Sequence, residues 1–157
     1  MKTKQSQPIP QSAPIRNLVY TASIQIRWGD MDAIGHVNNT EYFRYMEQAR
    51  IDWYTQSLGT LGDGGSGPVL VNAQCTFLRQ LRYPGTVEVA IFVGAVGRSS
   101  METMYELRRS DQPDVIYAEG RATVVWVSFA EEKSIALPEH IRERLPGGAF
   151  FNDPLQK

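Results

Sequence analysis

A polar stretch between Arg27 and Arg50 holds many of the side chains in this chain that are suited to acid–base chemistry; it reads RWGDMDAIGHVNNTEYFRYMEQAR. It places two carboxylates, Asp30 and Asp32, and the histidine His36 just before a predicted helix. Carboxylate and imidazole groups accept and donate protons, and the amides at a helix N-terminus favour developing negative charge. If the protein is an enzyme, we expect its site to lie in this stretch.

The helix predicted after these side chains has a clear start and a clear end. Asn38 can cap its first turn, and the spacing of Asn38 and Glu41 resembles a capping box, so the start falls near Asn38 or Asn39. Gly59 is a natural stop. Apolar residues recur between these ends at helical spacing: Tyr42, Met46, Ala49 and Trp53, widened by Phe43, Tyr54 and Leu58. The sequence therefore predicts a helix from about 39 to 58, roughly 30 Å long at about 1.5 Å per residue.

Strand patterns surround this helix. Residues 20–28 alternate between apolar and polar side chains before it. Four further runs of strand character follow it, at 69–77, 87–96, 101–108 and 116–129. Short turns join most of these later strands, which implies an antiparallel sheet with the helix covering one face. The sequence therefore predicts an α+β fold, in which small residues in the middle of the last strand let the helix approach the sheet closely.

The domain organisation is simple. The pattern predicts a single domain over 19–145, preceded by a disordered, proline-punctuated segment at 1–18 and followed by a flexible tail at 146–157. The glycine-rich segment 62–67 lacks the Lys-Ser/Thr of a phosphate-binding P-loop, so we interpret it as a linker. A short helix is expected at 138–145, with proline at its start. The second face of the sheet stays partly apolar, which predicts an oligomer; its residues are Val125, Val127 and Phe129.

Composition and charge exclude several classes of protein. A net charge of -1 and a pI near 6.1 give no basic footprint for nucleic acid. No apolar run approaches the roughly 18 to 20 residues needed to cross a bilayer, and the N-terminus lacks the apolar core of a secretory signal. The single cysteine, Cys75, excludes an internal disulfide, and with two histidines it leaves too few ligands for structural zinc. We expect a cytoplasmic protein without metal or cofactor, and with no nucleic-acid or membrane partner.

The run DMDAIGHVNN, followed by an aromatic-rich helix that ends in Glu47-Gln48-Ala49-Arg50, resembles hotdog-fold acyl-CoA thioesterases of the 4-hydroxybenzoyl-CoA thioesterase-like family. The resemblance continues through 77–79 and 97–100 to about Phe129. It implies a long central helix wrapped by a five-stranded antiparallel sheet with a short C-terminal helix. It also implies a homodimer or a homotetramer with active sites at the dimer interface, and an acyl-CoA substrate.

The resemblance also implies roles for the polar stretch. Asp32 matches the catalytic carboxylate of the family, as base or as nucleophile, and the amides of Asn39 and Thr40 match its oxyanion donors. His36 is placed to donate to the thioester or orient water, or simply to stabilise the turn. Asp30 is expected to be structural, through Arg27 or the turn.

A second carboxylate competes for the role of base. Some hotdog thioesterases use a helical glutamate, which makes Glu47 a candidate, although Glu47 and Arg50 are also spaced for a simple i, i+3 ion pair. Cys75 is expected in the core and His140 at the surface.

The phosphates of coenzyme A call for basic side chains, hydroxyls and free amides. The turn at Arg98, Ser99 and Ser100 matches a CoA-binding turn of the family, and Arg79 and Arg82 are further basic candidates. Two other functions stay open: a non-catalytic acyl-CoA-binding or scaffold protein, and a hotdog dehydratase acting on 3-hydroxyacyl thioesters.

Overall fold

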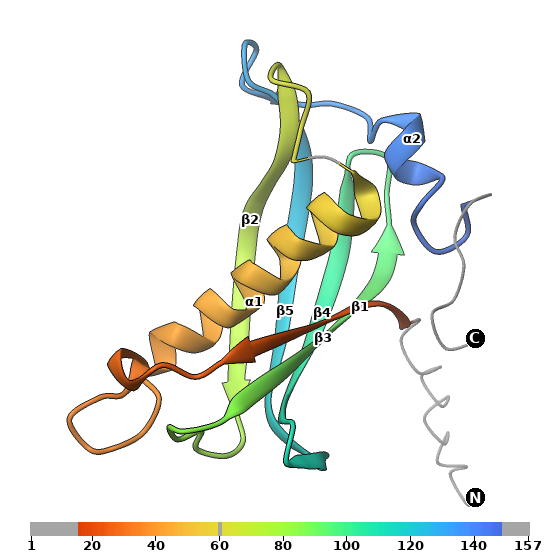
Figure 1. The fold of residues 1–157 in the computed structure, drawn as a ribbon. Coiled ribbons are helices and arrows are strands. Elements are labelled where there is room, and N and C mark those ends of the chain that lie inside the picture. The colour runs from red at the N-terminus through yellow and green to blue at the C-terminus, as the bar shows by residue number, and fades with distance from the viewer. Residues whose placement is uncertain (1–15, 60, 149–157) are drawn as a thin grey trace, which may run out of the picture.

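The computed structural model describes residues 16–59 and 61–148, and it shows one helix packed across a strongly curved sheet (Figure 1). The segments expected to be disordered or flexible, 1–18 and 146–157, lie mostly outside the described residues. The helix predicted near 138–145 is present as a short element, α2 (Glu139–Arg142), which begins after Pro138. The predicted α+β architecture is confirmed.

The sheet is antiparallel throughout, with strand order β1-β3-β4-β5-β2. Its strands are β1 (Asn17–Gln25), β2 (Ser66–Phe77), β3 (Thr86–Val96), β4 (Ser100–Arg109) and β5 (Gln112–Ser128), and the two-residue β6 (Lys133–Ser134) pairs with β5. The five predicted strands are therefore present, with β3, β4 and β5 as a meander. The strands nearest the helix in sequence, β1 and β2, form the two opposite edges.

The helix α1 (Asn39–Trp53) continues into a π-helical turn, Tyr54–Leu58, and ends at Gly59, whose φ is 78°. Only glycine adopts this left-handed conformation without strain, so Gly59 is the predicted stop. At the other end the Asn38 side chain caps the helix by accepting from the Thr40 amide at 3.0 Å. The Asn38 amide, however, donates to the Asp30 carbonyl oxygen at 2.9 Å, so the reciprocal half of a capping box with Glu41 is not formed.

The core lies between α1 and the concave face of the sheet. Buried residues of α1, Tyr42, Met46, Ala49 and Trp53, face alternate residues of β4 and β5. Gly120 of β5 lies directly against the Met46 sulfur, and an added Cβ would overlap it. The small residue in the last strand therefore allows the close helix-to-sheet approach that the sequence predicted.

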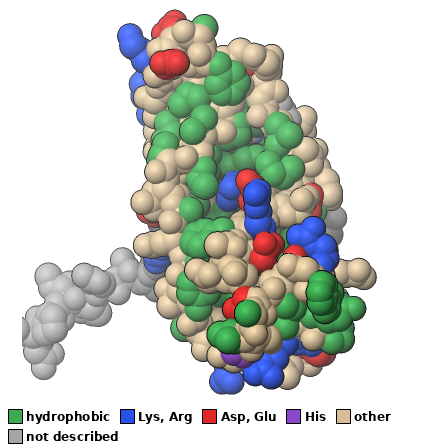
Figure 2. All heavy atoms as spheres, turned by 90° about the vertical axis from the view of Figure 1, so that its left-hand side faces the viewer, with side chains coloured by type: hydrophobic (Ala, Val, Ile, Leu, Met, Phe, Trp, Pro, Cys, Tyr) green, Lys and Arg blue, Asp and Glu red, His purple; other side chains and the backbone are tan. Residues whose placement is uncertain are grey.

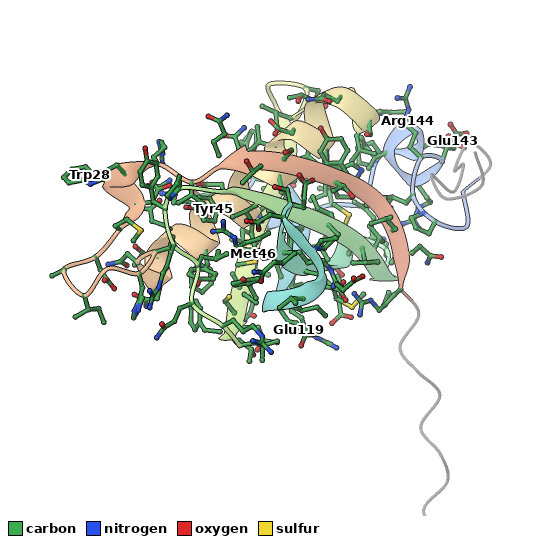
Figure 3. All side chains as sticks on the ribbon, turned by 60° about the horizontal axis from the view of Figure 1, so that its bottom comes forward. Trp28, Tyr45, Met46, Glu119, Glu143 and Arg144 are labelled. Carbon is green, nitrogen blue, oxygen red and sulfur yellow. The ribbon has the colours of Figure 1, made fainter. Side chains whose placement is uncertain are left out.

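Two sequence expectations about burial are wrong. The alternation of residues 20–28 puts Trp28 on the apolar face of the first strand, but β1 ends at Gln25 and Trp28 is 78% exposed, pointing away from the body of the protein (Figure 3). Phe43 is exposed, whereas Tyr45 is buried in its place on the helix. The residues at 69–77 form an edge strand, as part of β2, and are largely exposed.

Candidate active site

Asp30 is a structural carboxylate at the base of the candidate site. It is 3% exposed and accepts hydrogen bonds from the Arg27 amide at 2.8 Å, from Arg27 Nε at 3.0 Å and from the Tyr45 hydroxyl at 2.7 Å. Burial, followed by the bond to Asp30, raises the pKa of Tyr45. These bonds hold the 3₁₀ turn Trp28–Asp30 against α1, and they agree with the structural role expected for Asp30.

Asp32 organises the loop that precedes the helix. Its Oδ1 accepts from the amides of Ile34 at 3.0 Å and His36 at 3.2 Å, while its own amide donates to the His36 carbonyl oxygen at 2.7 Å. Gly35 completes the turn with a φ of 81°. The second carboxylate oxygen, Oδ2, makes no hydrogen bond within the described part of the chain. One oxygen therefore fixes the loop, and the other is available to act on a ligand.

Asp32 lines a cavity of about 390 Å³ at the N-terminal end of α1. The cavity is bounded by Asp32, His36, Val37, Asn39, Tyr42, Phe77, Leu78, Arg79 and Gln80. Its floor is held to the helix because the Tyr42 hydroxyl donates to the Arg79 carbonyl oxygen at 3.3 Å and accepts from the Leu81 amide at 3.0 Å. The structure thus brings together four of the residues selected from sequence, namely Asp32, His36, Asn39 and Arg79.

Arg82 lies beside His36, with its Nη2 atom 3.1 Å from Nε2 of the imidazole. A guanidinium only donates hydrogen bonds, so Nε2 is the acceptor and the ring proton sits on Nδ1 in this arrangement. Arg82 is therefore near the predicted catalytic loop, in contact with its histidine.

The two amides expected to stabilise an oxyanion differ in availability. The Thr40 amide is occupied by the Asn38 side chain, which also accepts from the Thr40 hydroxyl at 2.8 Å. The Asn39 amide donates no hydrogen bond to any described residue, and Asn39 faces the cavity that contains Asp32. Asn39 is therefore the better placed donor, with the positive end of the helix dipole behind it.

A second cavity of about 240 Å³ lies along α1, between the helix and strands β2, β4 and β5. Thr40, Phe43, Glu47 and Arg50 line it from the helix. Glu47 pairs with Arg44 at 2.8 Å, and not with Arg50, so the proposed Glu47–Arg50 ion pair is absent. Figure 2 faces this side of the protein and shows basic and acidic side chains amid hydrophobic ones, with a histidine toward the lower end.

The predicted phosphate-binding turn lies away from Asp32 in the protomer. Arg98 and Ser99 form the turn between β3 and β4, next to α2 and at the opposite end of the molecule from the 31–37 loop (Figure 1). Their carbonyl oxygens accept from Leu137 and Trp126, at 2.9 and 2.8 Å. Ser100 begins β4. One protomer therefore unites Arg79 and Arg82 with Asp32, but not the turn at 98–100.

Other candidate groups do not form a site. Cys75 is half-buried on β2, and burial raises the pKa of its thiol to about 11, which disfavours the reactive thiolate. His140 is exposed on α2, as expected. Within the described residues, no three His, Cys, Asp or Glu side chains gather as a set of metal ligands, and no helix has the length and apolar character to cross a membrane.

Comparisons with known proteins place this arrangement in context. The PA2801 protein of Pseudomonas aeruginosa, provisionally described as a thioesterase, is 42% identical with a TM-score of 0.76, over 80% of this chain and 97% of that one. A 1,4-dihydroxy-2-naphthoyl-CoA thioesterase from Synechocystis is 18% identical with a TM-score of 0.75, over 81% of this chain and 95% of that one, which is a likeness of fold alone. The YsmA protein of Bacillus subtilis is 25% identical over 122 residues, 78% of this chain and 82% of its own length.

A family model also matches the chain, from residue 26 to residue 145. The matched region begins just before the Asp30–Asp32 loop and runs through α1 and the whole meander to α2. Sequence resemblance, the wrapped-helix fold and this match all agree. The chain belongs to the thioesterase-like superfamily and has the hotdog fold.

Proposed function

We propose that the protein hydrolyses acyl-CoA thioesters at the N-terminal end of α1. The observation that carries this proposal is the cavity that combines Asp32, His36 and the unoccupied Asn39 amide, with Arg79 at its edge. Thioester hydrolysis needs a carboxylate and an oxyanion donor in one place, and this cavity supplies both. Membership of the thioesterase-like superfamily supports the same class of reaction.

Two routes fit the geometry of Asp32. As a base, its free oxygen takes a proton from water while that water attacks the thioester carbonyl carbon; the carbon–sulfur bond then breaks and the thiolate leaves. As a nucleophile, the carboxylate attacks the carbonyl itself, the thiolate leaves, and water hydrolyses the resulting anhydride. In both routes the carbonyl oxygen becomes negative, and the Asn39 amide and helix dipole stabilise it.

Glu47 remains the competing carboxylate, because it lines the neighbouring cavity with Thr40. It is exposed and its charge is partly balanced by Arg44, at 2.8 Å. In that alternative the substrate carbonyl lies farther along α1, and Asp32 serves only to shape the loop. We favour Asp32 because it shares its cavity with the unoccupied Asn39 amide.

A thiol-release assay with purified protein over short, long and aromatic acyl-CoAs tests the function. We expect hydrolysis of at least one class of ester, with release of free CoA. No release from any ester, together with calorimetric binding of acyl-CoA, would instead support the non-catalytic binding protein. Appearance of an enoyl product in an ultraviolet assay would support the dehydratase.

We also propose that a second copy of the chain completes the site. The edge strand β2 leaves hydrophobic side chains exposed, namely Val69, Leu70, Val71 and Phe77, and such an edge is suited to pair with another strand. A partner related by two-fold symmetry could then contribute its Arg98–Ser100 turn to the phosphates of CoA. We expect a dimer or a dimer of dimers in sedimentation velocity, and a monomer at micromolar concentration would contradict this arrangement.

A further inference from the structure

The buried guanidinium of Arg50 has no use in the proposed hydrolysis. Its residue is 8% exposed and lies on the face of α1 that lines the 240 Å³ cavity. Within the described part of the chain it makes one hydrogen bond, from Nη1 to the Tyr105 hydroxyl at 3.1 Å. No described carboxylate lies within ion-pair distance of it. A guanidinium that lines a cavity, with most of its donors making no bond to a described residue, is suited to bind an anionic group of a ligand.

The surrounding hydroxyls cannot supply that group. The Thr103 hydroxyl donates to the Ala122 carbonyl oxygen at 3.3 Å. The Tyr105 hydroxyl oxygen lies 2.9 Å from the Thr103 hydroxyl oxygen, so Tyr105 donates to Thr103 and accepts from Arg50. This chain uses one of the five N–H donors of the guanidinium. The buried Tyr54 hydroxyl is also without a hydrogen-bond partner among the described residues, and burial raises its pKa, against the opposing effect of Arg50. Donors are thus in excess and acceptors are lacking.

The cavity runs along α1 from Arg50 to Thr40, in the first turn of the helix. Thr40, Phe43, Glu47 and Arg50 follow the i, i+3, i+7 and i+10 spacing of one helix face. Thr40 and Asn39 are neighbours in the first turn, and Asn39 lines the cavity of Asp32. From Thr40 to Arg50 the helix rises about 15 Å, at about 1.5 Å per residue. Phe43, Met46, Leu70 and Ala73 form the apolar part of the cavity wall, and the charged side chains of Arg44, Glu47 and Arg121 line it as well.

We infer that the acyl group lies along this face of α1 and carries a carboxylate at its far end, which the remaining N–H donors of Arg50 bind. The preferred substrates are then the CoA esters of dicarboxylic acids. An acyl chain of the same length without the terminal carboxylate would displace water from the Arg50 guanidinium and would accept no hydrogen bond from it. Glu47, the nearest acid in the cavity, is balanced by Arg44 and does not neutralise Arg50. The hydrolysis of these esters rests on the proposed function, whereas the binding of their terminal carboxylate at Arg50 does not depend on it.

The test compares pairs of CoA esters of equal chain length, with and without a terminal carboxylate. We expect the carboxylated ester to have the higher kcat/KM in the wild-type protein at the length that spans the cavity, by about tenfold to a hundredfold. In Arg50→Met this advantage should vanish or reverse, because methionine keeps the volume and removes the donors. Arg144→Met, an exposed arginine that donates to the Ser57 carbonyl oxygen, is the matched control and should keep the wild-type ratio.

The length at which the advantage peaks also separates the two candidate bases. A carbonyl held at the first turn requires a chain that spans about 15 Å, whereas a carbonyl held at Glu47 lies only one helical turn from Arg50. A peak at long dicarboxylic esters therefore supports Asp32, and a peak at short ones supports Glu47.

Calorimetry with the free acids provides a readout that does not need turnover. Dicarboxylic acid should bind the wild-type protein more tightly than the monocarboxylic acid of equal length, and Arg50→Met should abolish the difference. Selective binding without hydrolysis of any ester would refute the proposed function and leave this inference intact. Equal binding of both acids, together with equal or faster hydrolysis of the unsubstituted esters at every length, would overturn it.

Discussion

Replacing Asp32 by asparagine is expected to lower kcat/KM for thioester hydrolysis by about 10²- to 10⁴-fold. Asparagine keeps the shape of the side chain, and its carbonyl oxygen can still accept from the amides of Ile34 and His36, as Oδ1 of Asp32 does. The loop should therefore keep its form while the proton acceptor or nucleophile is lost. The measurement is thiol release on the best substrate, with the melting temperature as a check that the fold is unchanged.

Glu47→Gln is the matched variant for this experiment, because it neutralises the competing carboxylate in the same way. If Asp32 is the base, Glu47→Gln should keep activity to within about tenfold, the effect of a lost surface ion pair with Arg44 and a small change in the cavity. Full activity in Asp32→Asn with loss of activity in Glu47→Gln would reverse the assignment. Cys75→Ser should retain activity in either case, because the thiol is half-buried and its pKa is raised.

Replacing Asp30 by alanine is expected to have the largest effect on stability, lowering the free energy of unfolding by about 2–4 kcal/mol. The change leaves the Tyr45 hydroxyl, in a residue that is 2% exposed, without its acceptor. It also frees the Arg27 amide and leaves the Arg27 guanidinium with Glu41, at 3.8 Å, as its remaining partner. Urea denaturation followed by circular dichroism measures the loss.

Two variants separate the parts of this effect. Tyr45→Phe removes the hydroxyl together with its need for an acceptor, so it should be destabilising by about 1 kcal/mol, less than Asp30→Ala. Asp32→Ala removes a less buried carboxylate two residues away and should likewise have the smaller effect. If Asp30→Ala and Asp32→Ala were equally stable, the Asp30 cluster would not be a structural anchor.

The helix was predictable because its signals are local. Asn38 and Gly59 act on the backbone within a turn of their own positions, and the prediction of a helix from 39 to 58 matches α1 with its π-helical end. The spatial order of the strands is not encoded in this way. Alternation identifies which residues share a face, but not which strand lies beside which, so the positions of β1 and β2 at the edges came only from the structure.

Trp28 shows how a side chain can override a pattern. Alternation continues through Trp28 in sequence, but the Asp30 carboxylate binds the Arg27 amide and turns the backbone into a 3₁₀ turn, which ends the strand at Gln25. The buried Asp30 carboxylate is held in this position by the Tyr45 hydroxyl, fifteen positions farther along the chain. A period-two pattern of apolar residues cannot reveal that contact.

The candidate site was predictable in part. The loop at Asp32 and His36 and the start of α1 are contiguous in sequence, so their proximity followed from the motif, whereas the placement of Arg79 required the fold. The sequence offered Arg50 only as a possible i, i+3 partner of Glu47, although it falls four positions after Met46 and next to Ala49, on the buried stripe. An arginine in a buried helical position was the available signal for this donor, whose guanidinium bonds to the Tyr105 hydroxyl.

The position of β1 and β2 at opposite edges of the sheet also bears on how the chain folds. Strands β3, β4 and β5 are consecutive and pair through short turns, whereas β1 pairs with β3 across α1 and β2, and β2 pairs with β5 across the meander. Closing such long loops costs chain entropy before any contact forms, so the meander is the part that local contacts can nucleate. The loop that carries Asp32 closes locally, through the Met31–Val37 bridge and the bonds of Asp32 to Ile34 and His36. It is placed against the rest of the fold only when Val37 bonds to Leu81 and β1 pairs with β3.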